Sequence, residues 1–237
     1  MITRNHIFFK LVNLPVFMKY NLVCFDVDGT LVDNIIYSWQ IFHDYFKTDP
    51  NKREFARQSF LNGKFSYIEW AEHDIAMWIE KGATKEKMWD AMKTAGICLM
   101  PGARETIHEL RKKGYKLAII SGTINIILEY LLPEYESLFD YIYLSRLYFD
   151  KSGKISRVVA TSFDMAAKAD ALKKIAKKEN IPLSQCVFIG DHHNDVEIAK
   201  EAGLAIAFDA KDEQLRKVSD IIIDDKDLTK ILSHIIN

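Results

Sequence analysis

The fold of this chain is decided by residues 22–30, which read LVCFDVDGT. Residues 22–27 form a nearly continuous apolar run of strand length, and such runs are typical of strands that are covered on both faces of a parallel sheet. Similar runs occupy residues 116–121, 186–190, 204–208 and 220–224. Segments with helical periodicity lie between them, at residues 103–113, 166–178 and 195–202. This alternation predicts an α/β doubly wound fold around a mostly parallel sheet.

Two segments depart from the alternation. Residues 141–160 contain two β-rich stretches around Asp150-Lys151-Ser152-Gly153, which predicts a hairpin. Residues 34–97 have only helical patterns, with Ile68, Ala71, Ile75 and Trp78/Ile79 at helical spacing. We therefore predict a catalytic core over residues 18–33 and 98–237, interrupted by an all-helical cap over residues 34–97.

All four tryptophans lie in the predicted cap. They are Trp39, Trp70, Trp78 and Trp89. Filling the core of a small helical bundle is the commoner role for such residues, and lining a substrate pocket is the alternative.

The composition describes a globular chain with balanced charge. Hydrophobic residues make up 49% of the 237 residues, and 32 basic against 33 acidic residues leave a formal net charge of −1. This balance gives no electrostatic reason to expect nucleic acid or an anionic membrane as a partner. Three cysteines do not make a disulfide framework, and they fit a reducing, cytoplasmic compartment. The sequence does not indicate an oligomeric state.

The first 17 residues precede the predicted core. They read MITRNHIFFKLVNLPVF, an apolar stretch that Lys10, Asn13 and Pro15 interrupt and that no small-residue cleavage site follows. Such a stretch is too short and too broken to span a bilayer, and it lacks the features of a signal peptide. From Met18 the chain leads within a few residues into the first predicted strand, as expected at the start of a domain. We therefore interpret residues 1–17 as an extension without a membrane role.

Two carboxylates emerge together at the end of the first predicted strand. Asp26 and Asp28 are two residues apart, so in an extended chain their side chains point to the same side. Open α/β sheets bind ligands at the carboxyl ends of their strands, and Gly29 allows a sharp turn there. Taken alone, the pattern also fits two solvated carboxylates in a turn.

Two further short motifs point to an anion. Ser121-Gly122-Thr123 ends a predicted strand and is expected to open a helix, where a hydroxyl and free backbone N–H groups bind anions. Lys168 lies in the first turn of a predicted helix, where a cation opposes the helix dipole unless an anion is near. Each feature alone is more often a helix cap or a solvated lysine.

A second pair of carboxylates follows the run at residues 186–190. Asp191 and Asp195 occur within Gly190-Asp191-His192-His193-Asn194-Asp195, and oxygen-rich sites of this kind suit Mg²⁺. His192 and His193 suggest zinc at first sight. Adjacent residues rarely ligate one ion, however, and no Cys/His spacing elsewhere supports zinc.

Taken together, these motifs resemble the haloacid dehalogenase superfamily, and within it the phosphoserine-phosphatase-like branch. The resemblance extends from Met18 to the C-terminus. It includes the Asp-x-Asp-Gly-Thr opening, the Ser-Gly turn, Lys168 before the Gly-Asp-x-x-Asn-Asp element, and the trailing AGLAIAFDAK. The joint occurrence of these motifs in this order is highly specific. The helical insert has the position and size of that branch's cap domain.

The resemblance implies a Mg²⁺-dependent phosphomonoesterase that acts on a small phosphorylated metabolite through an aspartyl-phosphate. It implies that Asp26 is the nucleophile, and that Asp28 protonates the leaving alkoxide and then activates the hydrolytic water. Mg²⁺ is expected to be held by Asp26, the Asp28 carbonyl and Asp191. Asp195 is expected to orient the metal's water shell or Lys168. The phosphate or the substrate is expected to meet Ser121, the Gly122 amide, Lys168 and Asn194.

The resemblance leaves the identity of the substrate open. In phosphoserine phosphatases a Glu after the first motif meets the substrate amine and an Arg in the cap meets its carboxylate. This chain has Ile35 at the first position and Asp74 where the second falls, and its cap arginines are Arg53 and Arg57. Phosphoserine phosphatase remains an alternative, as does a phosphotransferase or mutase with the same intermediate. A non-catalytic binding module is a third alternative, which the intact motifs disfavour.

Overall fold

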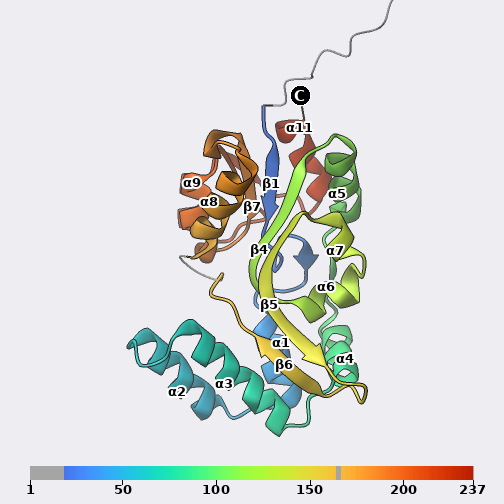
Figure 1. Ribbon diagram of the computed structural model, residues 1–237, viewed down its shortest axis with the longest axis vertical. Coiled ribbons are helices and arrows are strands. Elements are labelled where there is room, and N and C mark those ends of the chain that lie inside the picture. The colour runs from blue at the N-terminus through green and yellow to red at the C-terminus, as the bar shows by residue number, and fades with distance from the viewer. Residues whose placement is uncertain (1–18, 164–166, 237) are drawn as a thin grey trace, which may run out of the picture.

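A seven-stranded sheet forms the centre of the protein. In the computed structural model, which describes residues 19–163 and 167–236, the strands run in the order β6-β5-β4-β1-β7-β8-β9 (Figure 1). They are β1 (Leu22–Phe25), β4 (Lys116–Ile124), β5 (Tyr141–Phe149), β6 (Ile155–Val159), β7 (Cys186–Gly190), β8 (Leu204–Phe208) and β9 (Ile221–Ile223). Neighbouring strands are parallel from β5 to β9, and β6 forms an antiparallel hairpin with β5. The predicted α/β fold and the hairpin are confirmed.

Alternate residues of the central strands face opposite sides of the sheet. In β1, Val23 and Phe25 belong to one buried hydrophobic cluster, whereas Leu22 and Cys24 belong to the other. The same alternation continues in β7, where Cys186 joins Cys24 in the second cluster. The continuous apolar runs in the sequence therefore arise because both faces of the sheet are buried.

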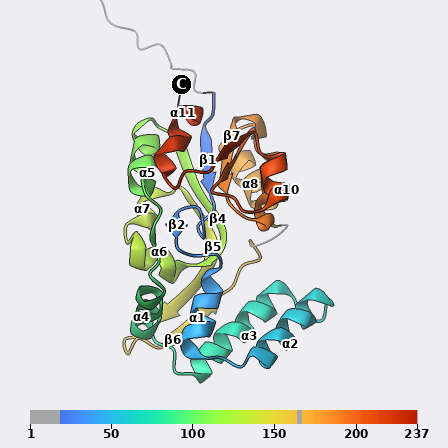
Figure 2. The same cartoon turned by 180° about the vertical axis from the view of Figure 1, so that it is seen from behind.

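Helices cover both faces (Figures 1 and 2). One face is covered by α8 (Ala167–Glu179), α9 (Val196–Glu201) and α10 (Glu213–Val218). The other is covered by α5 (Ala103–Lys112), α6 (Asn125–Leu131), α7 (Tyr135–Leu138), η3 (Leu228–Ile231) and α11 (Leu232–Ile235). Two more 3₁₀ turns are η1 (Leu183–Gln185) and η2 (His193–Asp195). The helix predicted from residue 195 thus begins one residue later, after the turn η2.

The helical insert consists of four helices at the carboxyl end of the sheet. They are α1 (Ser38–Phe46), α2 (Pro50–Leu61), α3 (Tyr67–Glu80) and α4 (Lys85–Ala95). A short antiparallel ribbon of β2 (Val32–Asp33) and β3 (Cys98–Leu99) joins the insert to the core. The helical pattern predicted for residues 34–97 is confirmed, and the division into domains stays a prediction.

Local signals explain where these helices begin and end. The side chain of Asp49 caps α2, whose first residue is Pro50. Ser66 and Glu69 form a reciprocal capping box at the start of α3. At the end of α4, Gly96 adopts the left-handed conformation that commonly ends helices.

The tryptophans of the insert have different environments. Trp39 and Trp78 are fully buried and pack with their ring centroids 5.2 Å apart, so the core interpretation holds for this pair. Trp70 is half-buried, and Trp89 is 38% exposed. The helix predicted from the spacing in α3 is confirmed, and Ala71, Ile75 and Trp78 form its buried stripe. The outer members of this spacing, Ile68 and Ile79, are 44% and 48% exposed, because they flank the buried stripe.

The hairpin β5–β6 reaches down to the insert (Figure 1). The backbone N–H of Lys85 in α4 donates to the carbonyl of Gly153 at 2.8 Å, and Thr84 bridges to Lys154. The Lys85 ammonium also lies 2.8 Å from Glu129 in α6. Helix α4 is therefore attached to the core at both its backbone and its side chains.

Within residues 19–163 and 167–236, no helix has both the length and the apolar character needed to cross a bilayer. The interpretation of residues 1–17 lies outside the described residues.

Candidate active site

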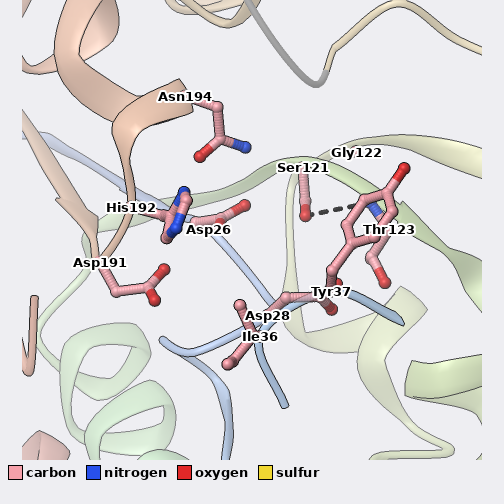
Figure 3. Close-up of a pocket in the computed structure, with 10 residues that line it drawn as sticks. All are labelled: Asp26, Asp28, Ile36, Tyr37, Ser121, Gly122, Thr123, Asp191, His192 and Asn194. Atoms are coloured by element: carbon pink, nitrogen blue, oxygen red, sulfur yellow. Dashed lines mark hydrogen bonds between the residues drawn. The ribbon is translucent and has the colours of Figure 1, made fainter. Parts of the chain in front are cut away.

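The carboxyl ends of β1, β4 and β7 surround a pocket of about 130 Å³ (Figure 3). Its walls are Asp26, Asp28, Ile36, Tyr37, Ser121, Gly122, Thr123, Asp191, His192 and Asn194. Most residues that the sequence analysis selected are therefore brought together. Lys168 and Asp195, which complete the selected set, are fully buried, and the Lys168 ammonium bonds to the carboxylates of both Asp26 and Asp195.

A sharp turn after β1 brings the two carboxylate-bearing loops together. Gly29 has φ +77°, a conformation that favours glycine, and its N–H donates to the carbonyl of Val32 at 2.9 Å. A Cβ atom on Gly29 would lie 2.1 Å from Oδ2 of Asp191. Glycine is required here both for the backbone angle and for the close approach of the Asp191 carboxylate.

Lys168 forms two buried ion pairs. Its ammonium lies 2.9 Å from Oδ1 of Asp26 and 2.6 Å from Oδ1 of Asp195. The second oxygen of Asp195 accepts hydrogen bonds from the backbone N–H groups of Asp191 and His192, at 3.0 and 3.3 Å. Burial raises the pKa of Asp195, and the Lys168 ammonium opposes that rise. Asp195 thus has both oxygens engaged.

Asp28 is held by the first helix of the insert. The backbone N–H of Ser38 donates to Oδ2 of Asp28 at 2.7 Å, and the Thr123 hydroxyl donates to the Ser38 hydroxyl at 3.0 Å. Burial, reinforced by the neighbouring Asp26 carboxylate, raises the pKa of Asp28 to about 6. A carboxyl group with such a pKa can both donate and accept a proton near neutral pH.

The site carries an excess of negative charge. Among the described residues around the pocket, the carboxylates of Asp26, Asp28, Asp191 and Asp195 face one ammonium, that of Lys168. Burial, followed by the charge of Asp195, raises the pKa of Asp191 to about 9. Without a further cation, the arrangement therefore disfavours the ionisation of all four carboxyl groups at once.

The donor set fits a divalent cation. Oxygen atoms of Asp26, Asp191 and Asp195 lie within 4.8 Å of one another. Oδ1 of Asp191 is buried and has no hydrogen-bond partner among the described residues. Carboxylate oxygens are the ligands that hard cations such as Mg²⁺ prefer.

The segment Ser121–Thr123 differs from its predicted structure. It was expected to open a helix, but β4 continues to Ile124 and α6 begins only at Asn125. The pairing of β4 with β5 shifts register between Ile120 and Ile124, so the three residues form a bulge at the strand end. The groups that were predicted to bind an anion therefore belong to a strand bulge instead of a helix start.

Comparison with known proteins identifies the family. Residues 20–203 match the family model of the haloacid dehalogenase-like hydrolases. The chain belongs to this family. It is 34% identical over 218 residues to phosphoserine phosphatase from Methanocaldococcus jannaschii, which covers 92% of this chain and 98% of that protein. It is also 37% identical over 202 residues to phosphoserine phosphatase SerB2 from Mycobacterium tuberculosis, covering 84% of this chain and 46% of the relative.

Solved structures agree with this placement. A substrate-bound phosphoserine phosphatase superimposes with a TM-score of 0.67 at 32% identity, covering 92% of this chain and 99% of the other. A phospho-aspartyl intermediate analogue of phosphoserine phosphatase gives a TM-score of 0.66 at 32% identity with the same coverage. This haloacid dehalogenase-like hydrolase is a phosphatase of the phosphoserine-phosphatase-like branch.

Several residues of the hydrolase's site were not among the site residues that the sequence analysis predicted. Ile36, Tyr37 and Thr123 line the pocket, and Ser38 and Trp39 bond to its walls. Thr123 was quoted only as part of a motif. Ile36 and Tyr37 follow Ile35 directly, and that proximity to the first motif was the one available signal for them.

The remaining residues that the sequence analysis discussed lie partly outside the pocket. His192 lines it, whereas His193 is exposed beside Asp212, with 3.5 Å between the imidazole and the carboxylate. Asp74 is buried in the insert, 3.1 Å from Nε2 of His43. Arg53 and Arg57 line a separate groove of about 490 Å³ that shares Tyr37 with the pocket.

Proposed function

We propose that this phosphatase hydrolyses the phosphomonoester of a small metabolite with Asp26 as the nucleophile and Mg²⁺ as the metal. One observation carries the proposal: Asp26 and Asp28 leave the same strand end and enter one pocket opposite Ser121 (Figure 3). A nucleophilic carboxylate, a second carboxyl that can carry a proton and a phosphate-binding hydroxyl are the groups that a two-step phosphoryl transfer needs.

Charge compensation is the main requirement of the first step. A carboxylate at about 4 Å from a phosphate dianion meets roughly 8 kcal/mol of repulsion at an effective dielectric constant near 20. The Lys168 ammonium, 2.9 Å from Asp26, offsets part of this repulsion. Mg²⁺ held by Asp26, the Asp28 carbonyl and Asp191 would supply further positive charge beside the phosphoryl group.

Asp28 moves the protons. Asp26 attacks phosphorus, the bond to the leaving oxygen breaks, and the proton of Asp28 passes to the departing alkoxide. Asp28 then takes a proton from the water that attacks the aspartyl-phosphate, which releases phosphate and restores Asp26. The pKa of about 6 and the bond from the Ser38 N–H support this dual role.

The remaining residues hold and orient. Because both oxygens of Asp195 are already engaged, we assign it to holding Lys168 and the loop after β7, although its proximity to Asp26 and Asp191 would also allow a metal contact. Ser121 and the Gly122 amide would bind the phosphoryl oxygens. Asn194 lies at the pocket wall, where the phosphate or the leaving group would pass.

We propose that residues 34–97 act as a cap that shapes substrate choice. Ile36 and Tyr37 supply the part of the pocket wall that belongs to this segment, and Ile36 is 81% exposed. Asp74 stands where phosphoserine phosphatases are expected to have an arginine for the substrate carboxylate, but it is paired with His43. The apolar wall and the missing arginine favour a leaving group other than the zwitterionic serine. Phosphoserine stays the second candidate because both relatives described above are phosphoserine phosphatases. The free cysteines Cys24, Cys98 and Cys186 support a cytoplasmic location.

Phosphate release from a panel of phosphorylated metabolites tests the proposal. The panel includes phosphoserine and p-nitrophenyl phosphate, with and without Mg²⁺. Asp26→Asn should abolish release while the protein stays folded, and Asp33→Asn is the matched control because Asp33 pairs with Lys226 outside the pocket. Substantial activity in Asp26→Asn would refute the nucleophile, and transfer of phosphate to a sugar without net release would indicate a phosphotransferase.

A further inference from the structure

Residues 121–123 contribute to the pocket but lack the support of the sheet. The register of β4 with β5 is interrupted between Ile120 and Ile124, and its pairing with β1 ends at Ile119. Among the described strands, none therefore pairs with this segment in the ladders. The orientation of its peptide groups must be fixed by other contacts, because a backbone without ladder hydrogen bonds keeps conformational freedom.

A tryptophan from the insert supplies such a contact. The indole N–H of Trp39 donates to the carbonyl of Gly122 at 3.0 Å, and both groups are buried. Trp39 is 1% exposed, and its ring packs against Trp78. The donor is thus held firmly in position, 83 residues away in sequence from the carbonyl it contacts.

The carbonyl that Trp39 contacts belongs to the same peptide group as the N–H of Thr123. The peptide group between Gly122 and Thr123 is planar, so fixing its carbonyl also fixes the N–H of Thr123. That N–H donates to Oγ of Ser121 at 3.2 Å (Figure 3). The Thr123 N–H occupies one acceptor position of Oγ, so the hydroxyl hydrogen of Ser121 points in a different direction. Because Ser121 lines the pocket, that hydrogen is available to a group bound there.

We propose that Trp39 is a positioning residue for phosphate binding, acting through the Gly122–Thr123 peptide on the Ser121 hydroxyl. The inference rests on the proposed function, in which Ser121 and Gly122 bind the phosphoryl group. It assigns to the first helix of the insert a role in the chemistry of the core. Trp39 does not line the pocket, so it acts without touching the substrate.

Trp78 offers a matched control. It is 0% exposed, packs against Trp39 and donates its indole N–H to Nδ1 of His43 at 3.3 Å, away from the pocket. Trp39→Phe and Trp78→Phe each remove one buried indole hydrogen bond and a similar volume from the same cluster. Both variants are expected to lower Tm by similar amounts.

The discriminating measurement is competitive inhibition of p-nitrophenyl phosphate hydrolysis by inorganic phosphate. Trp39→Phe should raise the Ki for phosphate about fivefold, the equivalent of one neutral hydrogen bond. Trp78→Phe should leave Ki at the wild-type value. Equal Ki values in all three proteins, or equal shifts in both variants, would overturn the inference.

A double-mutant cycle tests whether the effect passes through Ser121. In a Ser121→Ala background, Trp39→Phe should cause no further change in Ki. Additive effects would contradict the proposed route. If Trp39→Phe does not fold, incorporation of the benzothiophene analogue of tryptophan at position 39 removes the N–H donor and keeps the ring shape. A wild-type protein that hydrolyses no ester in the presence of Mg²⁺ would refute the proposed function itself, separately from this inference.

Discussion

At the scale of single residues, the site depends on close approaches that only certain side chains allow. Gly29 and Asp191 meet so closely that any side chain at residue 29 would occupy the carboxylate's position. Lys168 is fully buried. Among the described residues, Asp26 and Asp195 form the ion pairs that balance its charge. These residues therefore tolerate little change, for steric reasons in the first case and electrostatic reasons in the second.

Gly29→Ala should reduce both stability and metal binding. Alanine at φ +77° costs about 1–2 kcal/mol of unfolding free energy, and the added methyl group would displace Asp191. Gly153→Ala is the matched control, because Gly153 has φ +78° but open space around its Cβ position. Urea unfolding should show a similar loss of unfolding free energy from the backbone strain in both variants. Mg²⁺ titration should show weakened binding only in Gly29→Ala. Equal Mg²⁺ affinity would contradict the steric role.

At the scale of elements, the four helices of the insert differ in how they are attached. Helix α1 bonds to the pocket through Ser38 and Trp39, and α4 bonds to the β5–β6 hairpin and to α6. Helix α2 packs mainly on α3 and buries only Ala56 and Ser59. Helices with so little buried apolar surface open more easily than the rest of a protein.

Amide hydrogen exchange should follow this difference. We expect α2 and the start of α3 to exchange faster than α1 and α4. Ser66→Ala should accelerate exchange in α3 further, since it removes an N-cap worth about 1 kcal/mol. Ser137→Ala serves as the control, because the Ser137 hydroxyl bonds only locally to the Glu134 carbonyl. Uniform protection across all four helices would show that the insert opens as one unit.

The elements also show what the sequence could predict. The strand ends carrying Asp26 and Asp191 were predictable, because apolar runs locate strands and parallel strands end at the same edge of a sheet. The helix expected at Ser121 was wrong because a register shift against β5 is invisible in a local pattern. The Trp39–Gly122 bond and the pairing of Asp74 with His43 were equally out of reach, since they depend on contacts between segments far apart in the chain.

At the scale of the whole molecule, the buried carboxylates connect stability to pH and metal. Folding raises the pKa of Asp28 to about 6 and that of Asp191 to about 9, whereas an unfolded Asp has a pKa of about 4. At a pH between the unfolded pKa and the native pKa of each group, the native state keeps a proton that the unfolded state has lost. The contribution of these groups is therefore greatest at low pH and is lost as pH rises through the native pKa values.

The metal-free protein should lose thermal stability between pH 5 and pH 9, and Mg²⁺ should restore it. Because the cation replaces protons on the carboxylates, the increase in Tm on adding Mg²⁺ should grow with pH. Differential scanning calorimetry at several pH values, with and without Mg²⁺, measures both trends. Asp191→Asn should flatten the pH dependence above pH 7 and reduce the Mg²⁺ effect. A Mg²⁺ effect that is constant with pH would contradict the proposed ligand role of Asp191.

The unequal attachment of the insert has a consequence for how this enzyme can diversify. Helix α1 is tied to Asp28 and Gly122 of the proposed active site, so its sequence is constrained together with those loops. Helix α4 is tied instead to the β5–β6 hairpin and to α6. The α2–α3 pair carries Arg53, Arg57 and Trp70 on a groove beside the pocket. The opposite face of α3 packs on α1, where Trp78 contacts Trp39 and Asp74 pairs with His43. We expect exchange of α2 and of the groove-facing residues of α3 to alter substrate selectivity while the proposed catalytic residues keep their positions, which makes this outer part of the insert the natural place for specificity to diverge.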